Sequence, residues 1–139
     1  MKTFISHNEK DTEKIGEELG RICNPGDVFC LDGNLGAGKT VFARGFARGL
    51  NYDGRVTSPT FCIVNTYEST EMRLPLHHFD AYRLDAREMQ DIGFDEYLYA
   101  GGVCLIEWGE KISELLIDIP VTFVKIIIEG DTRIVRIIN

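Results

Sequence analysis

The most constraining feature of this 139-residue chain is a glycine-rich stretch at 28–40, which reads V-F-C-L-D-G-N-L-G-A-G-K-T. Its last eight residues, 33–40, match the pattern G-x-x-x-x-G-K-[ST] of a phosphate-binding loop (P-loop). The apolar run at 28–31 predicts a buried strand before the loop, and apolar residues four apart at 41–50 predict a helix after it. Strand, loop and helix in this order form the context that the motif requires, so the sequence predicts a nucleotide-binding protein.

The residue types of the loop suit a polyphosphate chemically. Small residues let backbone N–H groups surround the anion, and the N-terminus of the following helix adds its positive end. Lys39 would reach the β- and γ-phosphates, and the Thr40 hydroxyl would bind Mg²⁺. The predicted nucleotide-binding residues of this region are Gly33, Asn34, Leu35, Gly36, Ala37, Gly38, Lys39, Thr40 and Val41.

Length and composition predict a single domain over 1–139, because a chain of this size buries one hydrophobic core. Apolar residues make up 44% and charged residues 27%, as is typical of soluble globular proteins. No apolar run approaches the roughly 18 residues of a membrane helix. The first residues lack the apolar core of a signal peptide. We therefore expect a cytoplasmic protein without a membrane partner.

The net charge and the cysteines make three further classes less favoured: nucleic-acid-binding, disulfide-bonded and zinc-binding proteins. The formal net charge of −7 disfavours autonomous binding to nucleic acid, because an acidic surface repels phosphate backbones. Arg44 and Arg48 form the one local basic stripe, and such a pair is more often a solvated helix face. The four cysteines lack a C-x-x-C pair and lie in apolar surroundings, which favours buried free thiols over disulfides or zinc ligands.

The segment before the loop predicts a strand at 2–5 and then a helix. S-H-N-E at 6–9 fits a capping box, and Ile15, Leu19 and Ile22 recur at helical spacing. Asn24-Pro25-Gly26 predicts the turn that ends this helix.

The segment after the loop helix predicts two antiparallel hairpins and short helices. Strands at 61–67 and 74–79 would form the first hairpin, and strands at 121–128 and 133–138 the second. Asp85 would cap a short helix, 94–99 and 111–116 would be helical, and 103–106 is a further strand. The predicted fold class is α/β: a P-loop NTPase with a mixed central sheet, flanking helices and antiparallel hairpins.

Two apolar strands end in a carboxylate, as the acidic partner of a phosphate loop requires. These carboxylates are Asp80 and Glu107, and strand C-terminal ends gather at the ligand crevice of an open α/β sheet. His77 and His78 cannot chelate one metal ion together, because adjacent strand residues point to opposite faces. We expect one of them to be packed and the other to be exposed or near the site.

Four motifs occur in order and together resemble one family. They are G-N-L-G-A-G-K-T at 33–40, S-P-T-F at 58–61, H-F-D-A-Y-R-L at 78–84 and I-E-W at 106–108. The combination resembles the TsaE family of bacterial ATPases, formerly YjeE, over nearly the whole chain. The resemblance implies ATP hydrolysis in support of the threonylcarbamoyl modification of tRNA adenosine, together with TsaB and TsaD. Because the net charge is −7, we expect that tRNA is contacted only indirectly.

The resemblance also implies roles for individual residues. Thr40 and Glu107 would bind Mg²⁺, Lys39 the phosphates of ATP, and Asp80 would assist hydrolysis. A switch-like loop containing Ser58 and Thr60 would lie near the γ-phosphate. Glu9 and Arg133 would also contact the nucleotide. Asn34 departs from the family, which usually has an acid there, and removes one charge near the phosphates.

Two other classes of protein, small-molecule kinases and nucleotide-dependent binding switches, also use phosphate loops. A small-molecule kinase would need a lid and an acceptor pocket, for which this chain, with no Arg-rich insertion, has little room. A nucleotide-dependent binding switch that reads guanine would carry N-K-x-D, whereas 8–11 reads N-E-K-D and precedes the loop. Catalysis in the favoured class depends on charge supplied at the γ-phosphate. We therefore expect weak hydrolysis alone and stimulation by partners around 58–60 and 80–84.

Overall fold

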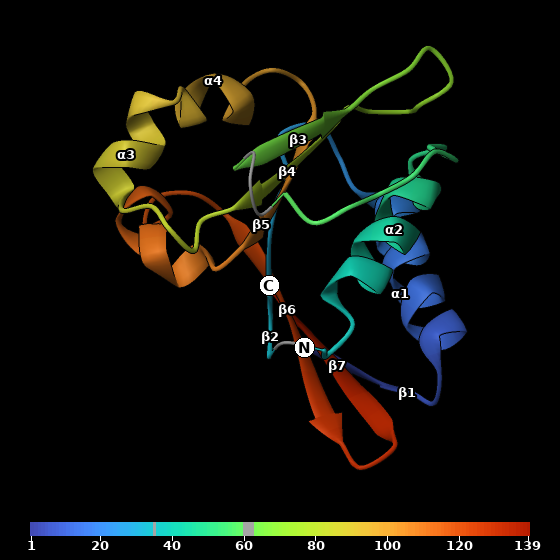
Figure 1. Ribbon diagram of the computed structural model, residues 1–139. Helices are drawn as coiled ribbons and strands as arrows, with labels where there is room; N and C mark the ends of the chain where they lie inside the picture. The colour runs from blue at the N-terminus through green and yellow to red at the C-terminus, as the bar shows by residue number, and fades with distance from the viewer. Residues whose placement is uncertain (35, 60–62) are drawn as a thin grey trace.

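The computed structural model describes residues 1–34, 36–59 and 63–139 (Figure 1). In chain order its elements are β1 (Lys2–Ser6), α1 (Glu9–Ile22), β2 (Val28–Gly33), α2 (Lys39–Gly49), β3 (Val64–Tyr67), β4 (Leu76–Asp80), α3 (Ala86–Asp91), α4 (Phe94–Leu98), β5 (Val103–Glu107), the 3₁₀-helix η1 (Gly109–Leu115), β6 (Val121–Glu129) and β7 (Thr132–Ile138).

All these strands form one sheet in the order β1-β7-β6-β2-β5-β4-β3. The central strand β2 pairs in parallel with β5 and β6, and β4 pairs in parallel with β5. The pairs β3–β4, β6–β7 and β1–β7 are antiparallel. The predicted α/β class, with a mixed sheet and two antiparallel hairpins, is confirmed. Because β6, β2, β5 and β4 run the same way, their C-terminal ends lie at one edge of the sheet.

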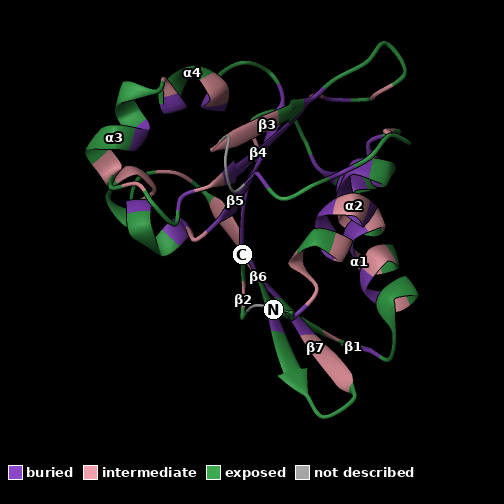
Figure 2. Ribbon diagram, viewed as in Figure 1, coloured by how far each residue is buried: buried purple, intermediate pink, exposed green. Residues whose placement is uncertain are grey.

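Helices cover both faces of the sheet around β2 and β5. In Figure 1, α1 and α2 lie on one face, and α3, α4 and η1 lie on the other. Phe29 and Leu31 of β2 belong to the core on the α2 side, whereas Val28 and Cys30 belong to the core on the opposite side. A strand buried on both faces reads as an unbroken apolar run, which explains the sequence before the loop. Figure 2 shows this buried centre and the more exposed β6–β7 hairpin.

Several predicted boundaries differ by a few residues, such as β4 at Leu76–Asp80 and η1 at Gly109–Leu115, and two differences have a clear local cause. The cap of α1 is Asn8, whose side chain accepts a hydrogen bond from the Asp11 N–H, and not a capping box that begins at Ser6. Of the strand predicted at 61–67, residues 61 and 62 lie outside the described residues, and β3 starts at Val64 because Ile63 has a φ of 67° and donates its N–H to the Pro59 carbonyl. The capping box at the start of α3 is present, with Asp85 and Glu88 bonding reciprocally.

Helices α1 and α2 pack backbone to backbone through glycines. The face of α1 against α2 is Thr12, Gly16 and Gly20, whereas Ile22 of the predicted apolar stripe is 69% exposed. A Cβ atom at Gly20 would lie 2.1 Å from the Phe46 carbonyl oxygen. This close approach sets the position of the helix that follows the loop.

We expect Gly20→Ala to lower the free energy of unfolding by about 2–3 kcal/mol. Alanine favours a helix by about 1 kcal/mol, but a methyl group against a backbone oxygen forces the helices apart and outweighs that gain. Urea denaturation would measure the loss. Glu18→Ala on the exposed side of the same helix is the control and should change stability by less than about 0.5 kcal/mol. A Gly20→Ala protein as stable as the parent would show that the helices separate freely.

The basic stripe of α2 faces α1 and is not simply solvated. Arg44 Nε lies 2.9 Å from Glu13 Oε2, and Arg48 also pairs with Glu13. The two arginines are therefore paired with one carboxylate of the neighbouring helix while their side chains stay partly exposed to solvent.

Cys23, Cys30 and Cys104 are buried free thiols, as predicted, and Cys62 lies outside the described residues. Burial raises the pKa of Cys30 and of Cys104 to about 12, so both stay protonated and unreactive at neutral pH. Within the described ranges, no helix has the length and apolar character needed to cross a membrane.

Candidate functional site

The glycine-rich loop joins the C-terminal end of β2 to the start of α2. Gly36 and Gly38 have φ angles of 82° and 109°, which other residues rarely adopt. Ala37 N–H donates to the Asn34 carbonyl at 2.9 Å and closes a tight turn. Leu35 lies outside the described residues. The sequence thus places glycine where the backbone conformation requires it.

The N-terminus of α2 has no side-chain cap. Gly38 is its N-cap residue, and the described residues form no side-chain cap hydrogen bond there. The first N–H groups of a helix lack partners within the helix and carry partial positive charge, so they suit an anion. An uncapped helix of eleven residues behind a glycine loop fits a phosphate group chemically.

The two predicted acids meet at the adjacent edge of the sheet. β4 and β5 pair with Asp80 opposite Glu107, and Glu107 also pairs with Leu31 of β2, just before the loop. Glu107 is 5% exposed, while Asp80 is half-buried and accepts a hydrogen bond from the Tyr82 N–H at 3.0 Å. Parallel pairing of β2, β5 and β4 therefore brings the loop and both carboxylates to one edge.

The side chain of Lys39 extends from the loop to Glu107, one of these two acids. Its Nζ lies 3.7 Å from Glu107 Oε1 and 5.0 Å from the centroid of the Trp108 ring. The Trp108 ring packs on Tyr82 at a centroid distance of 4.8 Å. Lys39 therefore rests on a buried carboxylate and an aromatic face, and phosphate oxygens would compete with both for its charge.

His78 is a site residue whose role the sequence pattern did not specify. It is fully buried, and its Nε2 lies 2.6 Å from Glu107 Oε2. The alternation of side chains along a strand could have indicated that His78 lies near the site. His78 stands two residues before Asp80 and so lies on the same face of the strand. His77 points to the other face and bonds to Thr66, as the prediction of opposite faces requires. Burial lowers the pKa of His77, although the Glu68 carboxylate opposes this shift.

A recess of about 200 Å³ lies beside the loop and brings in two further predicted residues. It is lined by Ser6, Asn8, Glu9, Thr12, Gly36, Ala37, Gly38, Val41, Asp131 and Arg133. Arg133 Nη2 lies 3.5 Å from the Gly36 carbonyl oxygen. Glu9 and Arg133, from opposite ends of the chain, thus line a recess that adjoins the phosphate loop.

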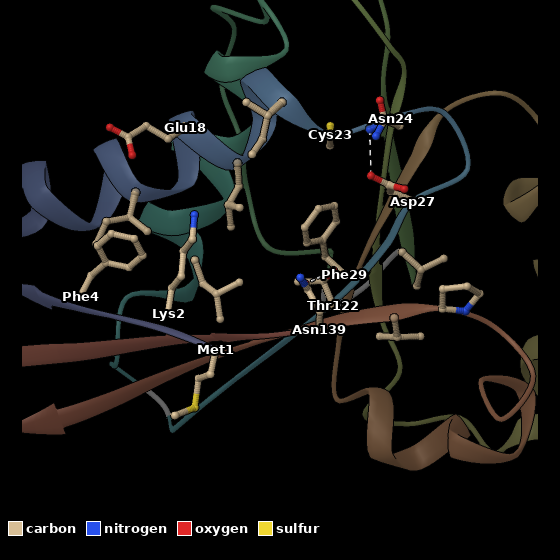
Figure 3. A pocket seen from close by; sticks show the side chains of 17 residues that line it. Met1, Lys2, Phe4, Glu18, Cys23, Asn24, Asp27, Phe29, Thr122 and Asn139 are labelled. Carbon is tan, nitrogen blue, oxygen red and sulfur yellow. Dashed lines mark hydrogen bonds between the residues drawn. The ribbon is translucent and has the colours of Figure 1, made fainter.

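A larger hollow, of about 600 Å³, lies elsewhere (Figure 3). It is bounded by the C-terminal part of α1, the starts of β2 and β6, and both chain termini, and its polar lining includes Lys2, Asp27 and Asn139. None of the described residues of the glycine loop lines it, so size alone does not identify the phosphate site.

The remaining predicted residues are placed as follows. Thr40 is exposed in the first turn of α2, and Ser58 is exposed in the segment between α2 and β3. Thr60 lies outside the described residues. Over the ranges that the structure covers, no group of three or more His, Cys, Asp or Glu side chains could hold a metal ion. A Mg²⁺ ion at this edge would therefore take further ligands from phosphate oxygens and water, as Mg²⁺ commonly does.

Comparisons with known proteins agree on one family. The model of the family "Threonylcarbamoyl adenosine biosynthesis protein TsaE" matches residues 6–137. The tRNA threonylcarbamoyladenosine biosynthesis protein TsaE of Bacillus subtilis is 46% identical over 109 residues, which are 78% of this chain and 67% of that protein. The TsaE protein of Treponema pallidum is 40% identical over 132 residues, which are 94% of this chain and 96% of that protein.

A solved structure agrees as well. The crystal structure of Bacillus subtilis YdiB superposes with a TM-score of 0.80 at 34% identity, covering 96% of this chain and 82% of that one. Fold, loop geometry and sequence matches over most of the chain lead to the same result: the protein has a P-loop NTPase fold and belongs to the TsaE family.

Proposed function

We propose that this chain binds ATP with Mg²⁺, hydrolyses it, and thereby supports N6-threonylcarbamoyladenosine formation in tRNA together with TsaB and TsaD. The observation that carries the proposal is the meeting of Lys39, Glu107 and Asp80 at the uncapped N-terminus of α2. The pathway follows from the names of the relatives, which are tRNA threonylcarbamoyladenosine biosynthesis proteins.

In this proposal the loop amides and Lys39 bind the β- and γ-phosphates. Lys39 exchanges its contact with Glu107 and Trp108 for phosphate oxygens, which are stronger partners for an ammonium group. Glu9 and Arg133 contact the nucleotide from the recess beside the loop. The loop with Ser58 and Thr60 responds to the γ-phosphate.

The two carboxylates have different roles in this proposal. Glu107 and the Thr40 hydroxyl would hold Mg²⁺, and the half-buried Asp80 would orient the attacking water. The donor set fits this ion, because carboxylate and hydroxyl oxygens are the hard ligands that Mg²⁺ takes alongside phosphate and water. When bound, Mg²⁺ neutralises charge on the β- and γ-phosphates.

Partners are part of the proposal because we recognise no arginine finger or lid for the γ-phosphate in residues 1–34, 36–59 and 63–139. A charge supplied by another protein at the γ-phosphate can raise a rate by about 10³–10⁵. The net charge of −7 makes direct tRNA binding unfavourable, so tRNA would be contacted through TsaB and TsaD.

Two measurements test the function. Calorimetric titration with Mg²⁺ should show tighter binding of ATP than of GTP. Steady-state hydrolysis should be slow for the isolated protein and should rise about tenfold or more when TsaB and TsaD are added. Strong stimulation by tRNA alone, or none by the two proteins, would refute the partner assignment. Preference for GTP would favour a binding switch, and a phosphorylated metabolite would favour a kinase.

A further inference from the structure

His78 is a polar side chain in the middle of a buried strand. It is 0% exposed, and its Nδ1 has no hydrogen-bond partner in the described part of the chain. An unsatisfied buried nitrogen disfavours folding, and an apolar side chain of similar size would fill the space without that penalty. Among the described residues, the polar contact of His78 is with Glu107, and this contact offsets part of that penalty.

That contact restrains the Glu107 carboxylate. His78 Nε2 lies 2.6 Å from Oε2, and because a carboxylate only accepts, the imidazole N–H donates. The other oxygen, Oε1, lies 3.7 Å from Lys39 Nζ in the phosphate loop. One oxygen is thus held by the core of the sheet while the other faces the loop.

The strand register makes this restraint rigid. His78 and Asp80 lie on the same face of β4, and Asp80 pairs with Glu107 across β4 and β5. The donor and the acceptor therefore sit on adjacent hydrogen-bonded strands rather than on loops. A site held by paired strands keeps its geometry more closely than a site on loops.

We infer that His78 is a positioning residue, which holds Oε2 of Glu107 and so presents Oε1 to the phosphate loop for the metal ion. The inference rests on the proposed function, because it assigns His78 to the acid that would bind Mg²⁺. Outer partners that orient metal-binding carboxylates and imidazoles typically change metal affinity by about 10–100-fold when they are removed.

The test compares two neighbouring buried histidines, of which only His78 contacts Glu107 among the described residues. The variants are His78→Leu, which fills the space without a donor, and His78→Gln, whose amide reaches the position of Nε2. His77→Leu is the matched control, because His77 is also buried but bonds to Thr66 on the other face. Mn²⁺ binding in the presence of a non-hydrolysable ATP analogue is followed by electron paramagnetic resonance. Binding of the analogue in EDTA is measured separately by calorimetry.

We expect His78→Leu to weaken Mn²⁺ binding by about 10–100-fold, while binding of the metal-free analogue changes by less than about twofold. His78→Gln should restore Mn²⁺ binding to within about threefold of the parent protein. His77→Leu should leave Mn²⁺ binding unchanged. Thermal denaturation of each variant shows which proteins are folded at the temperature of the measurement.

Several outcomes would overturn the inference. Parental Mn²⁺ affinity in a folded His78→Leu protein would do so, and so would equal losses in the His77 and His78 variants. If His78→Leu does not fold, the comparison becomes His78→Gln against His78→Asn, whose shorter amide does not reach Glu107. Equal Mn²⁺ affinity in that pair would also overturn it. Failure of the parent protein to bind the analogue at all would instead refute the proposed function.

Discussion

Lys39→Ala is expected to bind ATP about 100-fold more weakly than the parent protein and to show no measurable hydrolysis. Lys39 belongs to the phosphate loop, and its Nζ lies 3.7 Å from Glu107 at the sheet edge that carries the two acids. A hydrogen bond to a charged group contributes about 1.5–3 kcal/mol, and a loss of about 3 kcal/mol corresponds to roughly 100-fold in Kd. Calorimetric titration with ATP and Mg²⁺ measures the binding, and phosphate release measures the turnover.

The matched control for Lys39→Ala is Lys125→Ala. Lys125 is exposed on β6, and no ion pair to it is present among the described residues, so its removal should change neither binding nor hydrolysis. Because Lys39 also pairs with a buried carboxylate, denaturation curves must show that Lys39→Ala is folded. A folded Lys39→Ala protein with unchanged affinity and unchanged turnover would refute the assignment of the loop.

Asp80→Asn is expected to bind ATP within about threefold of the parent protein but to hydrolyse it about 10²–10⁴-fold more slowly. The asparagine carbonyl can still accept the Tyr82 N–H, so the turn after β4 is retained. The lost charge is the one that would orient or deprotonate the attacking water. Single-turnover hydrolysis, with ATP binding measured in parallel, separates the two effects.

Glu107→Gln is the contrasting variant and should fail in a different way. It can keep the hydrogen bond from His78 while losing the charge that would hold Mg²⁺. The Mg²⁺ concentration for half-maximal hydrolysis should rise by about tenfold or more, a change that Asp80→Asn should not show. Equal Mg²⁺ dependence in the two variants, or the reverse pattern, would show that the roles of the two acids are wrongly assigned.

Local patterns predicted much of the fold and the centre of the site. The strand, loop and helix around 28–50 are specified by periodicity and by glycines at positive φ, which are properties of neighbouring residues. The second hairpin was predictable for the same reason, since Gly130 at a φ of 59° makes the two-residue turn between β6 and β7. The strand endings at Asp80 and Glu107 were also visible, because each carboxylate follows an apolar run.

Hydrophobic periodicity missed one face of α1. The apolar spacing of Ile15, Leu19 and Ile22 predicted the helix, and Ile15 and Leu19 pack against the core, but the face against α2 is made by Thr12, Gly16 and Gly20. Glycine has no apolar side chain, so an analysis of hydrophobic periodicity does not detect a helix face that is made of glycines. In α1, glycine allows the two helices to approach closely. This contact is a property of the helix pair and cannot be detected in the sequence of one helix.

The sequence by itself determined the phosphate loop, its flanking elements, the two candidate acids and the family. Only the tertiary structure decided how these parts meet. His78 holds Glu107 from 29 residues away, and Arg133 reaches Gly36 across 97 residues. Such contacts depend on strand order and register, which arise from packing of the whole sheet and not from the residues adjacent in sequence. The parallel pairing of β2, β5 and β4 is the physical reason that a lysine, a histidine and two carboxylates share one edge.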